Sequence, residues 1–192
     1  MKANRTASYP GGHLIRDAAE SDITAVQRIY EHYVLNGVAT FEEMPPSVEE
    51  MVTRYRGIVA AGLPCLVAEL DEDAVGYSYA TPYRSRPAYR YTVEDSVYVA
   101  NGLQGRGIGG ALLQALVSRC ETGPWRQMLA VIGSSENAGS IALHRSMGFQ
   151  LVGTFASVGF KLGQWVDTVL MQRVLGAGSS VPPFRDNRER CK

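Results

Sequence analysis

Seven residues near the middle of the chain constrain its fold more than any other stretch: Gln104-Gly105-Arg106-Gly107-Ile108-Gly109-Gly110. They follow the apolar run Val97–Val99 and open a segment with apolar residues at helical spacing. This order predicts a strand, a glycine turn and a helix. Glycine lets the backbone approach a ligand closely, and the first N–H groups of a helix have no intrahelical partner. Because the helix dipole adds to these free donors, the turn is predicted to hold a pyrophosphate.

Two common phosphate motifs do not match this turn. A Walker A loop requires Lys followed by Ser or Thr after its last glycine, whereas Ala111 and Leu112 follow here. A dinucleotide fingerprint requires an acidic residue after the next strand, but the candidate strand 127–132 is followed by Gly133-Ser134-Ser135. On this motif alone, a plain glycine-rich turn stays open as the alternative.

Composition narrows the class of protein. A chain of 192 residues has the length of one domain with a substantial core. Its 19 basic and 19 acidic residues give a formal net charge of zero, so no nucleic-acid partner is expected. No apolar run is long enough for a membrane span, so no membrane partner is expected either. The three cysteines lie far apart without metal-ligand spacing, which predicts no metal site and a cytoplasmic, reducing location.

The pattern along the chain alternates between strands and helices, which predicts an α/β (α+β) fold. Strands are expected at 14–15, 66–70, 74–80, 93–100, 127–132, 149–156 and 166–173, and helices at 21–34, 47–60, 108–120 and 138–147. Ser21 is the expected N-cap of the first helix, and Ser47 with Glu50 fits a capping box for the second. One domain is predicted over 13–175, with an extension at 1–12 and a disordered tail at 176–192.

A second cluster runs from Asn137 to Gly148-Phe149. On a helix, the seven-residue separation of Asn137 and His144 places both on one face, two turns apart. Asn137 is interpreted either as a helix N-cap or as a ligand-binding amide, and the two roles are compatible. His144 is interpreted either as a satisfied imidazole or as a functional group.

The stretch Gln104 to Gly109 resembles the coenzyme A pyrophosphate loop, Gln-x-x-Gly-x-Gly, of the GNAT acetyltransferase superfamily, and Asn137 to Phe149 resembles a later motif of the same superfamily. The resemblance implies a mixed, mostly antiparallel sheet of about six to seven strands with about four helices, splayed where acetyl-CoA binds. It implies acetyl-CoA as cosubstrate and no metal. The implied cofactor-binding residues are Val97, Tyr98, Val99, Gln104, Gly105, Arg106, Gly107, Ile108, Gly109, Gly110, Asn137 and Ser140.

Residues 88–99, 130–133 and 159–167 resemble phosphinothricin N-acetyltransferases, and the likeness extends over about residues 14–172. It implies a small-molecule amine acceptor of the phosphinothricin, methionine sulfone or methionine sulfoximine type, and a homodimer. Asp95, Leu162 and Val166 depart from the pattern of that group, which leaves the particular acceptor open. Two other functions stay open, a protein or peptide N-acetyltransferase and a non-catalytic coenzyme A-binding module.

Acetyl transfer to an alkyl amine requires a base, because such an amine has a pKa of about 10.4 and is mostly protonated near neutral pH. Glu94 is the candidate, and the strand alternation places it with Ser96 and Tyr98 on one face, opposite Val97. Partial burial of Glu94 would raise its pKa and improve the base. The alternative is a solvated carboxylate or one paired with Arg90. By the resemblance, His144 lies near the coenzyme sulfur and protonates the thiolate or relays a proton.

Five residues are predicted to contact the acceptor. The resemblance assigns Arg86 and Tyr89 to substrate contact, and an arginine can bind a carboxylate through two hydrogen bonds. Phe41 and the pair Phe160-Lys161 are predicted to wall the pocket, with a partner subunit as one possible source. A solvated loop position is the alternative for Arg86, and core packing is the alternative for Phe41 and Phe160.

Overall fold

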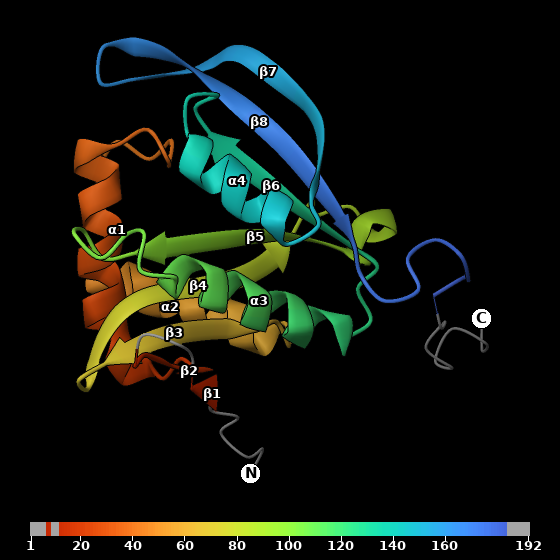
Figure 1. Ribbon diagram of the computed structural model, residues 1–192, viewed down its shortest axis with the longest axis horizontal. Helices are drawn as coiled ribbons and strands as arrows, with labels where there is room; N and C mark the ends of the chain where they lie inside the picture. Colours follow the sequence, from red (N-terminus) through yellow and green to blue (C-terminus); the bar gives the residue numbers. More distant parts are fainter. Residues whose placement is uncertain (1–6, 9–11, 184–192) are drawn as a thin grey trace.

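The computed structural model describes residues 7–8 and 12–183, and one mixed sheet forms its centre (Figure 1). The strand order is β1-β2-β3-β4-β5-β6-β8-β7, and each described neighbouring pair is antiparallel except β5 and β6. The strands are β1 Ala7–Ser8, β2 Leu14–Asp17, β3 Cys65–Leu70, β4 Asp73–Pro82, β5 Thr92–Val99, β6 Gln127–Gly133, β7 Gln150–Lys161 and β8 Gln164–Val174. The described sheet thus has eight strands, and the expectation of six to seven omits only the two-residue β1.

Two pairs of helices cover the two faces of this sheet (Figure 1). They are α1 Ile23–Asn36, α2 Val48–Ala60, α3 Ile108–Glu121 and α4 Ala138–Ser146. On one face, α1 and α2 pack against Val67 and Tyr77. On the other, α3 packs against β3, β4 and β5, while α4 contacts β6, β7 and α3. The alternating strand pattern therefore divides the apolar residues into two cores, one on each side of the sheet.

The helix starts agree with the sequence in one case and differ in another. Ser47 caps α2 as predicted, since its Oγ accepts a hydrogen bond from the Glu50 N–H at 3.2 Å. The first helix does not begin after Ser21; a short 3-10 turn, Glu20–Asp22, precedes α1. The cause lies in Asp22, whose carboxylate accepts from the Ala19 N–H and pairs with an arginine of β2, which tightens the chain before the helix.

The two last strands are much longer than predicted. They form a hairpin whose turn, Leu162–Gly163, has φ of 51° and 76°. A two-residue hairpin turn of this kind requires positive φ at both positions, and Asn or Asp before Gly is the usual signal for it. Leucine gives no such signal, so the sequence pattern did not reveal the hairpin. A register shift between Phe155 and Gly159 also interrupts the alternation of β7.

The loop between α1 and α2 rests on β6 and β7. A Cβ added to Gly133 would collide with the carbonyl oxygen of Val38, and one added to Gly159 would collide with the Phe41 ring. Lys161, only 3% exposed, donates from Nζ to the Thr40 carbonyl at 2.8 Å. These contacts fix the loop across the ends of two strands.

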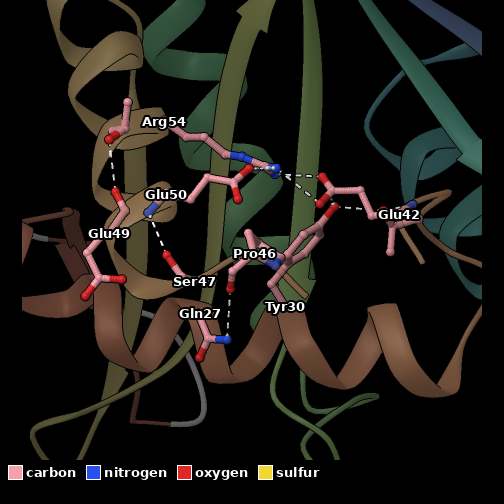
Figure 2. Close-up of polar contacts among 10 residues, drawn as sticks. Gln27, Tyr30, Glu42, Pro46, Ser47, Glu49, Glu50 and Arg54 are labelled. Carbon is pink, nitrogen blue, oxygen red and sulfur yellow. Dashed lines mark hydrogen bonds and ion pairs between the residues drawn. The ribbon is translucent and has the colours of Figure 1, made fainter. Parts of the chain in front are cut away.

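A polar cluster holds the same loop from the helix side (Figure 2). The Tyr30 hydroxyl, on α1, donates to Glu42 at 2.9 Å, and Arg54 of α2 donates two hydrogen bonds to that carboxylate. Arg54 also pairs with Glu50, and Gln27 donates to the Pro46 carbonyl at 3.2 Å. The loop is therefore bound to both of its flanking helices.

The ends of the chain are only partly described. Most of the predicted extension 1–12 and the last part of the predicted tail, residues 184–192, lie outside the described residues. Residues 176–179 form a turn after the buried Leu175, and both terminal predictions remain predictions. Among the described residues, no helix is long and apolar enough to cross a membrane.

Replacing Gly133 by alanine tests the contact between β6 and the α1–α2 loop. Because the added methyl group would meet the Val38 backbone, we expect the free energy of unfolding to fall by about 1–3 kcal/mol. Urea denaturation measures the change. Gly153→Ala is the matched control, since a Cβ at that strand position has no atom within 4 Å. Equal stability of the two variants would contradict the packing described.

Candidate active site

A cavity of about 570 Å³ opens where β5 and β6 diverge. Their parallel register ends at the pair Asp95 and Ala130, and beyond it both strands line the cavity. The start of α3 and the start of α4 complete the walls. Of the residues predicted to bind the cofactor or act in catalysis, those that line this cavity are Val97, Tyr98, Val99, Gln104, Gly105, Gly107, Gly109, Gly110, Asn137, Ser140 and His144.

The glycine turn gives this cavity a row of backbone donors. Gly105 and Gly107 have φ of 77° and 83°, values that side chains rarely tolerate, and Gly107 is the N-cap of α3. The N–H groups at the start of α3 have no partners within the helix. A Cβ on Gly109 would lie 3.5 Å from Leu143 and 3.6 Å from Val99, so the helix start packs closely on both neighbours. The turn is therefore shaped to receive an anionic group.

Two residues of the same motif lie elsewhere. Arg106 is exposed at the turn and does not line the cavity. Ile108 is 2% exposed and packs in the core between α3 and the sheet. Ile108 thus anchors the first turn of α3 by burial.

The edge of β5 also faces the cavity with backbone groups. The Ala100 N–H donates to the Val75 carbonyl of β4 at 2.8 Å. Since backbone groups alternate sides along an antiparallel strand, those of Val97 and Val99 face the gap toward β6. Tyr33, which sequence reasoning missed, donates from its hydroxyl to the Val99 carbonyl at 2.6 Å and lines the cavity. Nothing in the spacing of the α1 sequence marks Tyr33 for this contact.

At the start of α4, the position of Asn137 is compatible with both of its interpretations, a helix N-cap and a ligand-binding amide. Its Oδ1 accepts from the Ser140 N–H at 3.1 Å, so it caps the helix, and it also lines the cavity. One turn further on, the Ser140 carbonyl and hydroxyl approach the His144 ring. The seven-residue spacing therefore brings Asn137 and His144 to the same wall.

His144 is buried against a carboxylate that sequence reasoning did not place in the site. Its Nδ1 lies 2.7 Å from the Ser140 carbonyl oxygen and its Nε2 lies 3.0 Å from Asp95 Oδ2. Burial acts to lower the pKa of His144, but the hydrogen bond to Asp95 and the charge of that carboxylate outweigh it and raise the pKa. The strand alternation would have placed Asp95 on the cavity side, opposite Glu94.

Glu94 lies on the other face of β5, with Ser96 and Tyr98. It is half-buried and does not line the cavity. Burial raises the pKa of Glu94, the neighbouring Asp95 raises it further, and Arg84 opposes both. Glu94 and His144 thus flank the same strand from opposite sides.

The five residues predicted to contact the acceptor lie in three places. Arg86 and Tyr89 belong to the exposed loop between β4 and β5, where the Tyr89 ring meets Tyr83 edge-on. Phe41 lies on Gly159, and the Lys161 ammonium is buried beneath the same loop. Phe160 is 56% exposed and packs against Trp165 on the outer side of the hairpin. None of these five lines the cavity.

Residues 159–167 make hydrogen bonds that join the β7–β8 hairpin to neighbouring loops. Lys161 fastens the hairpin to the α1–α2 loop. Asp167 accepts from the Ser135 hydroxyl at 2.6 Å and from the Ser157 N–H at 2.8 Å, which joins β8 to the loop after β6 and to the irregular part of β7. Among the described residues, no group of His, Cys, Asp or Glu side chains could hold a metal ion.

Comparison with known proteins agrees with this geometry. Residues 15–170 match the family described as "Acetyltransferase (GNAT) domain". A phosphinothricin N-acetyltransferase of Alcaligenes faecalis is 51% identical over 169 residues, covering 88% of this chain and 86% of that protein. An L-methionine sulfoximine/L-methionine sulfone acetyltransferase of Salmonella typhimurium is 37% identical, covering 82% of this chain and 92% of the relative.

A solved structure shares the whole architecture. The phosphinothricin acetyltransferase of Sinorhizobium meliloti, crystallised with acetyl-CoA, superposes with a TM-score of 0.88 at 46% identity. The match covers 91% of this chain and 94% of the crystallised one. By its fold, its cavity and its sequence, this chain belongs to the GNAT family of acetyltransferases.

Proposed function

We propose that this chain transfers the acetyl group of acetyl-CoA to the amine of a small amino-acid-like substrate of the phosphinothricin, methionine sulfone or methionine sulfoximine type. The observation that carries the proposal is the cavity at the divergence of β5 and β6, which joins an anion-binding turn to a strand bearing Glu94. The acceptors named for the 51% and 37% identical relatives support this substrate class.

Acetyl-CoA fits the donor groups of the cavity. The N–H groups from Gly107 to Gly110 suit a pyrophosphate, because a helix start combines free donors with a favourable dipole. The backbone edge at Val97 and Val99 offers a line of hydrogen-bonding groups for an amide-containing arm, and Asn137 and Ser140 lie across from it. When bound, acetyl-CoA supplies an activated acetyl thioester.

Glu94 is the proposed base. The amine nitrogen forms a bond to the acetyl carbon while the carbon–sulfur bond breaks, and the proton lost from nitrogen goes to the Glu94 carboxylate, directly or through water. The raised pKa of Glu94 makes it a stronger base than an exposed carboxylate. The N–H of Val97 or Val99 is proposed to donate to the carbonyl oxygen as it gains negative charge.

His144 is the proposed group on the leaving side. The sulfur leaves with the bonding electron pair and takes up a proton, and His144 lines the cavity with a raised pKa that favours its charged form. The positive charge stabilises the thiolate, and the imidazolium supplies or relays the proton.

Arg86 and Tyr89 are proposed to recognise the acceptor. Their loop also carries Arg84, whose charge acts on the proposed base Glu94. The two donor edges of an arginine match the carboxylate of an amino acid. Phe41, on the α1–α2 loop, and Phe160 and Lys161, on the β7–β8 hairpin, are proposed to form a wall of the acceptor site.

A homodimer is proposed through the β7–β8 hairpin. Exposed apolar side chains gather on it: Leu151, Val152, Phe155, Val158, Phe160, Leu162, Trp165 and Val174. A large apolar patch on a sheet edge is typical of an interface. A second copy is the proposed occupant because β7 is an edge strand of the sheet, so its exposed surface can pack against the same surface of another chain about a two-fold axis.

The free thiols of Cys65 and Cys120 support a reducing, cytoplasmic location.

The proposed function is tested by acetyl-CoA binding and by thiol release with a panel of acceptors. We expect calorimetry to detect acetyl-CoA binding, because the cavity offers the backbone donors described. We expect turnover with at least one of phosphinothricin, L-methionine sulfone and L-methionine sulfoximine, and none with a peptide bearing a free N-terminus. Turnover of the peptide alone would replace the proposed acceptor class, and absence of binding would refute acetyl transfer.

Substitution of Glu94 by glutamine tests the base. Since the base acts in its ionised form, activity of the wild-type protein should rise with pH through the raised pKa of Glu94. The variant should lose that limb of the pH profile, and kcat/KM should fall by about 10²–10⁴-fold. Glu72→Gln, in the exposed β3–β4 turn, is the matched control. Unchanged turnover and an unchanged profile in Glu94→Gln would exclude the role.

Light scattering after size-exclusion chromatography tests the dimer. The wild-type protein should have twice the chain mass of 20.9 kDa. Trp165→Lys should dissociate it, because Trp165 is 67% exposed in the single chain and its charge would be buried in the interface. Val59→Lys, on the exposed side of α2, serves as control. A monomeric wild-type protein would rule out this interface.

A further inference from the structure

We infer that Asp95 is a positioning residue for the proposed reaction: it orients the His144 imidazole across the gap between β5 and α4 and supplies the buried negative charge that keeps a second proton on that ring. The inference rests on the proposed function for its meaning, but it is carried by the contacts around His144. Neither the sequence motifs nor the relatives' names assign any role to Asp95.

The hydrogen-bond partners of the ring favour an extra proton. His144 Nδ1 lies 2.7 Å from the Ser140 carbonyl oxygen, which can only accept, and 3.3 Å from the Ser140 hydroxyl, which can also donate; the shorter contact favours a hydrogen on Nδ1. The other nitrogen, Nε2, lies 3.0 Å from Asp95 Oδ2. This contact is a hydrogen bond only if a proton lies between the two atoms, on an imidazolium or on a carboxylic acid. In both cases the pair carries one proton more than a neutral imidazole beside a carboxylate.

Burial makes this shared proton favourable. The side chains of His144 and Asp95 are 6% and 1% exposed. A lone carboxylate at that depth would be costly, and a positive partner at hydrogen-bond distance offsets the cost. The proton therefore both neutralises the pair and fixes the orientation of the ring.

The other groups around the pair do not compete for this role. On α4 the Ser140 hydroxyl lies 3.3 Å from Nδ1, and Arg145 is exposed. Just before β7, the neutral Phe149 ring meets the imidazole edge-on at 5.1 Å. On α3, burial and the charge of Asp95 raise the pKa of the Cys120 thiol to about 12, so it stays neutral. Glu94 approaches from the same strand but from the opposite face.

One feature separates this pair from a purely structural ion pair. Asp95 Oδ1 is buried and has no hydrogen-bond partner within the described residues, and Asp95 and His144 both line the cavity. Most buried polar atoms have a hydrogen-bond partner, so an unsatisfied one calls for an explanation, and a catalytic role is one of them. The pair thus lies in the wall of the cavity that is proposed to hold acetyl-CoA.

Asp95 also connects the two proposed proton-transfer groups. It is adjacent to Glu94 in β5 and bonded to His144, so its charge acts on both faces of the strand. Removing that charge should lower the pKa of Glu94 and of His144 together. The proposed reaction gives the pH profile an acidic limb set by Glu94 and an alkaline limb set by His144. A loss of packing alone would reduce activity without moving both limbs in the same direction.

The decisive measurement is an NMR titration of the histidine rings in the full-length protein without acetyl-CoA. His13 and His32 serve as internal references, and His144→Gln assigns the third signal. In the wild-type protein we expect both ring nitrogens of His144 to stay protonated above the ordinary histidine pKa of about 6.5. A His144 that titrates at or below that value would overturn the inference without the need for any variant.

The isosteric Asp95→Asn variant extends the test. We expect the His144 signal to titrate at lower pH, because burial then acts without a countercharge, and Asp73→Asn at the exposed start of β4 should leave it unchanged. In turnover, Asp95→Asn should lower kcat by about 10²-fold with little change in the KM for acetyl-CoA, and shift both limbs of the profile to lower pH.

The outcomes distinguish the two proposals. An unchanged His144 titration in Asp95→Asn refutes the role of Asp95 even in an active enzyme. A shifted titration in a protein that acetylates no acceptor supports the Asp95–His144 contact and refutes the proposed function. If Asp95→Asn is active and its profile keeps the wild-type limbs, Asp95 is structural and the inference fails.

Discussion

The divergence of β5 from β6 after Asp95 and Ala130 is the constraint on which the rest of the site depends. If the parallel pairing continued, the backbone groups of Val97 and Val99 would be used within the sheet. Because the strands separate, those groups face a cavity, and the starts of α3 and α4 both open onto it. Two helix starts and one strand edge thus bring backbone groups to the same space, which suits a long anionic cosubstrate with amide groups along its length.

The two-residue period of β5 then divides the chemistry between the faces of the sheet. Glu94 faces the side of α1 and α2, whereas Asp95 faces His144 on the side of the cavity. Glu94, Asp95 and His144 therefore lie at two adjacent positions of β5 and on one facing helix. Asp95 and His144 are buried, whereas Glu94 is half-buried. The rigid strand fixes their separation, and the pairing of His144 with Asp95 makes a buried charge tolerable next to the site.

Much of the site was predictable because its signals are local. The glycine turn, the capped start of α2 and the spacing of Asn137 and His144 each depend on residues within two or three turns of one another. The features that were missed depend on contacts between distant segments. The 3-10 turn before α1 is set by an arginine of β2, and the hairpin turn at Leu162–Gly163 has no recognisable sequence signal. The contacts of Lys161, which ties the hairpin to the α1–α2 loop, and of Phe41, which packs on Gly159, also join distant segments, and the roles of both residues beside the acceptor stay predictions.

Local patterns were enough to predict the order of strands and helices, the anion-binding turn and the candidate base, because helical spacing, strand alternation and glycine chemistry act over a few residues. Which side chains meet depends on the packing of distant segments: Asp95 contacts His144 across 49 positions, the Tyr33 hydroxyl donates to the Val99 carbonyl, and the apolar hairpin stays exposed. Such contacts arise when distant segments are brought together by burial of the two cores, and no local pattern encodes which polar groups that burial places side by side.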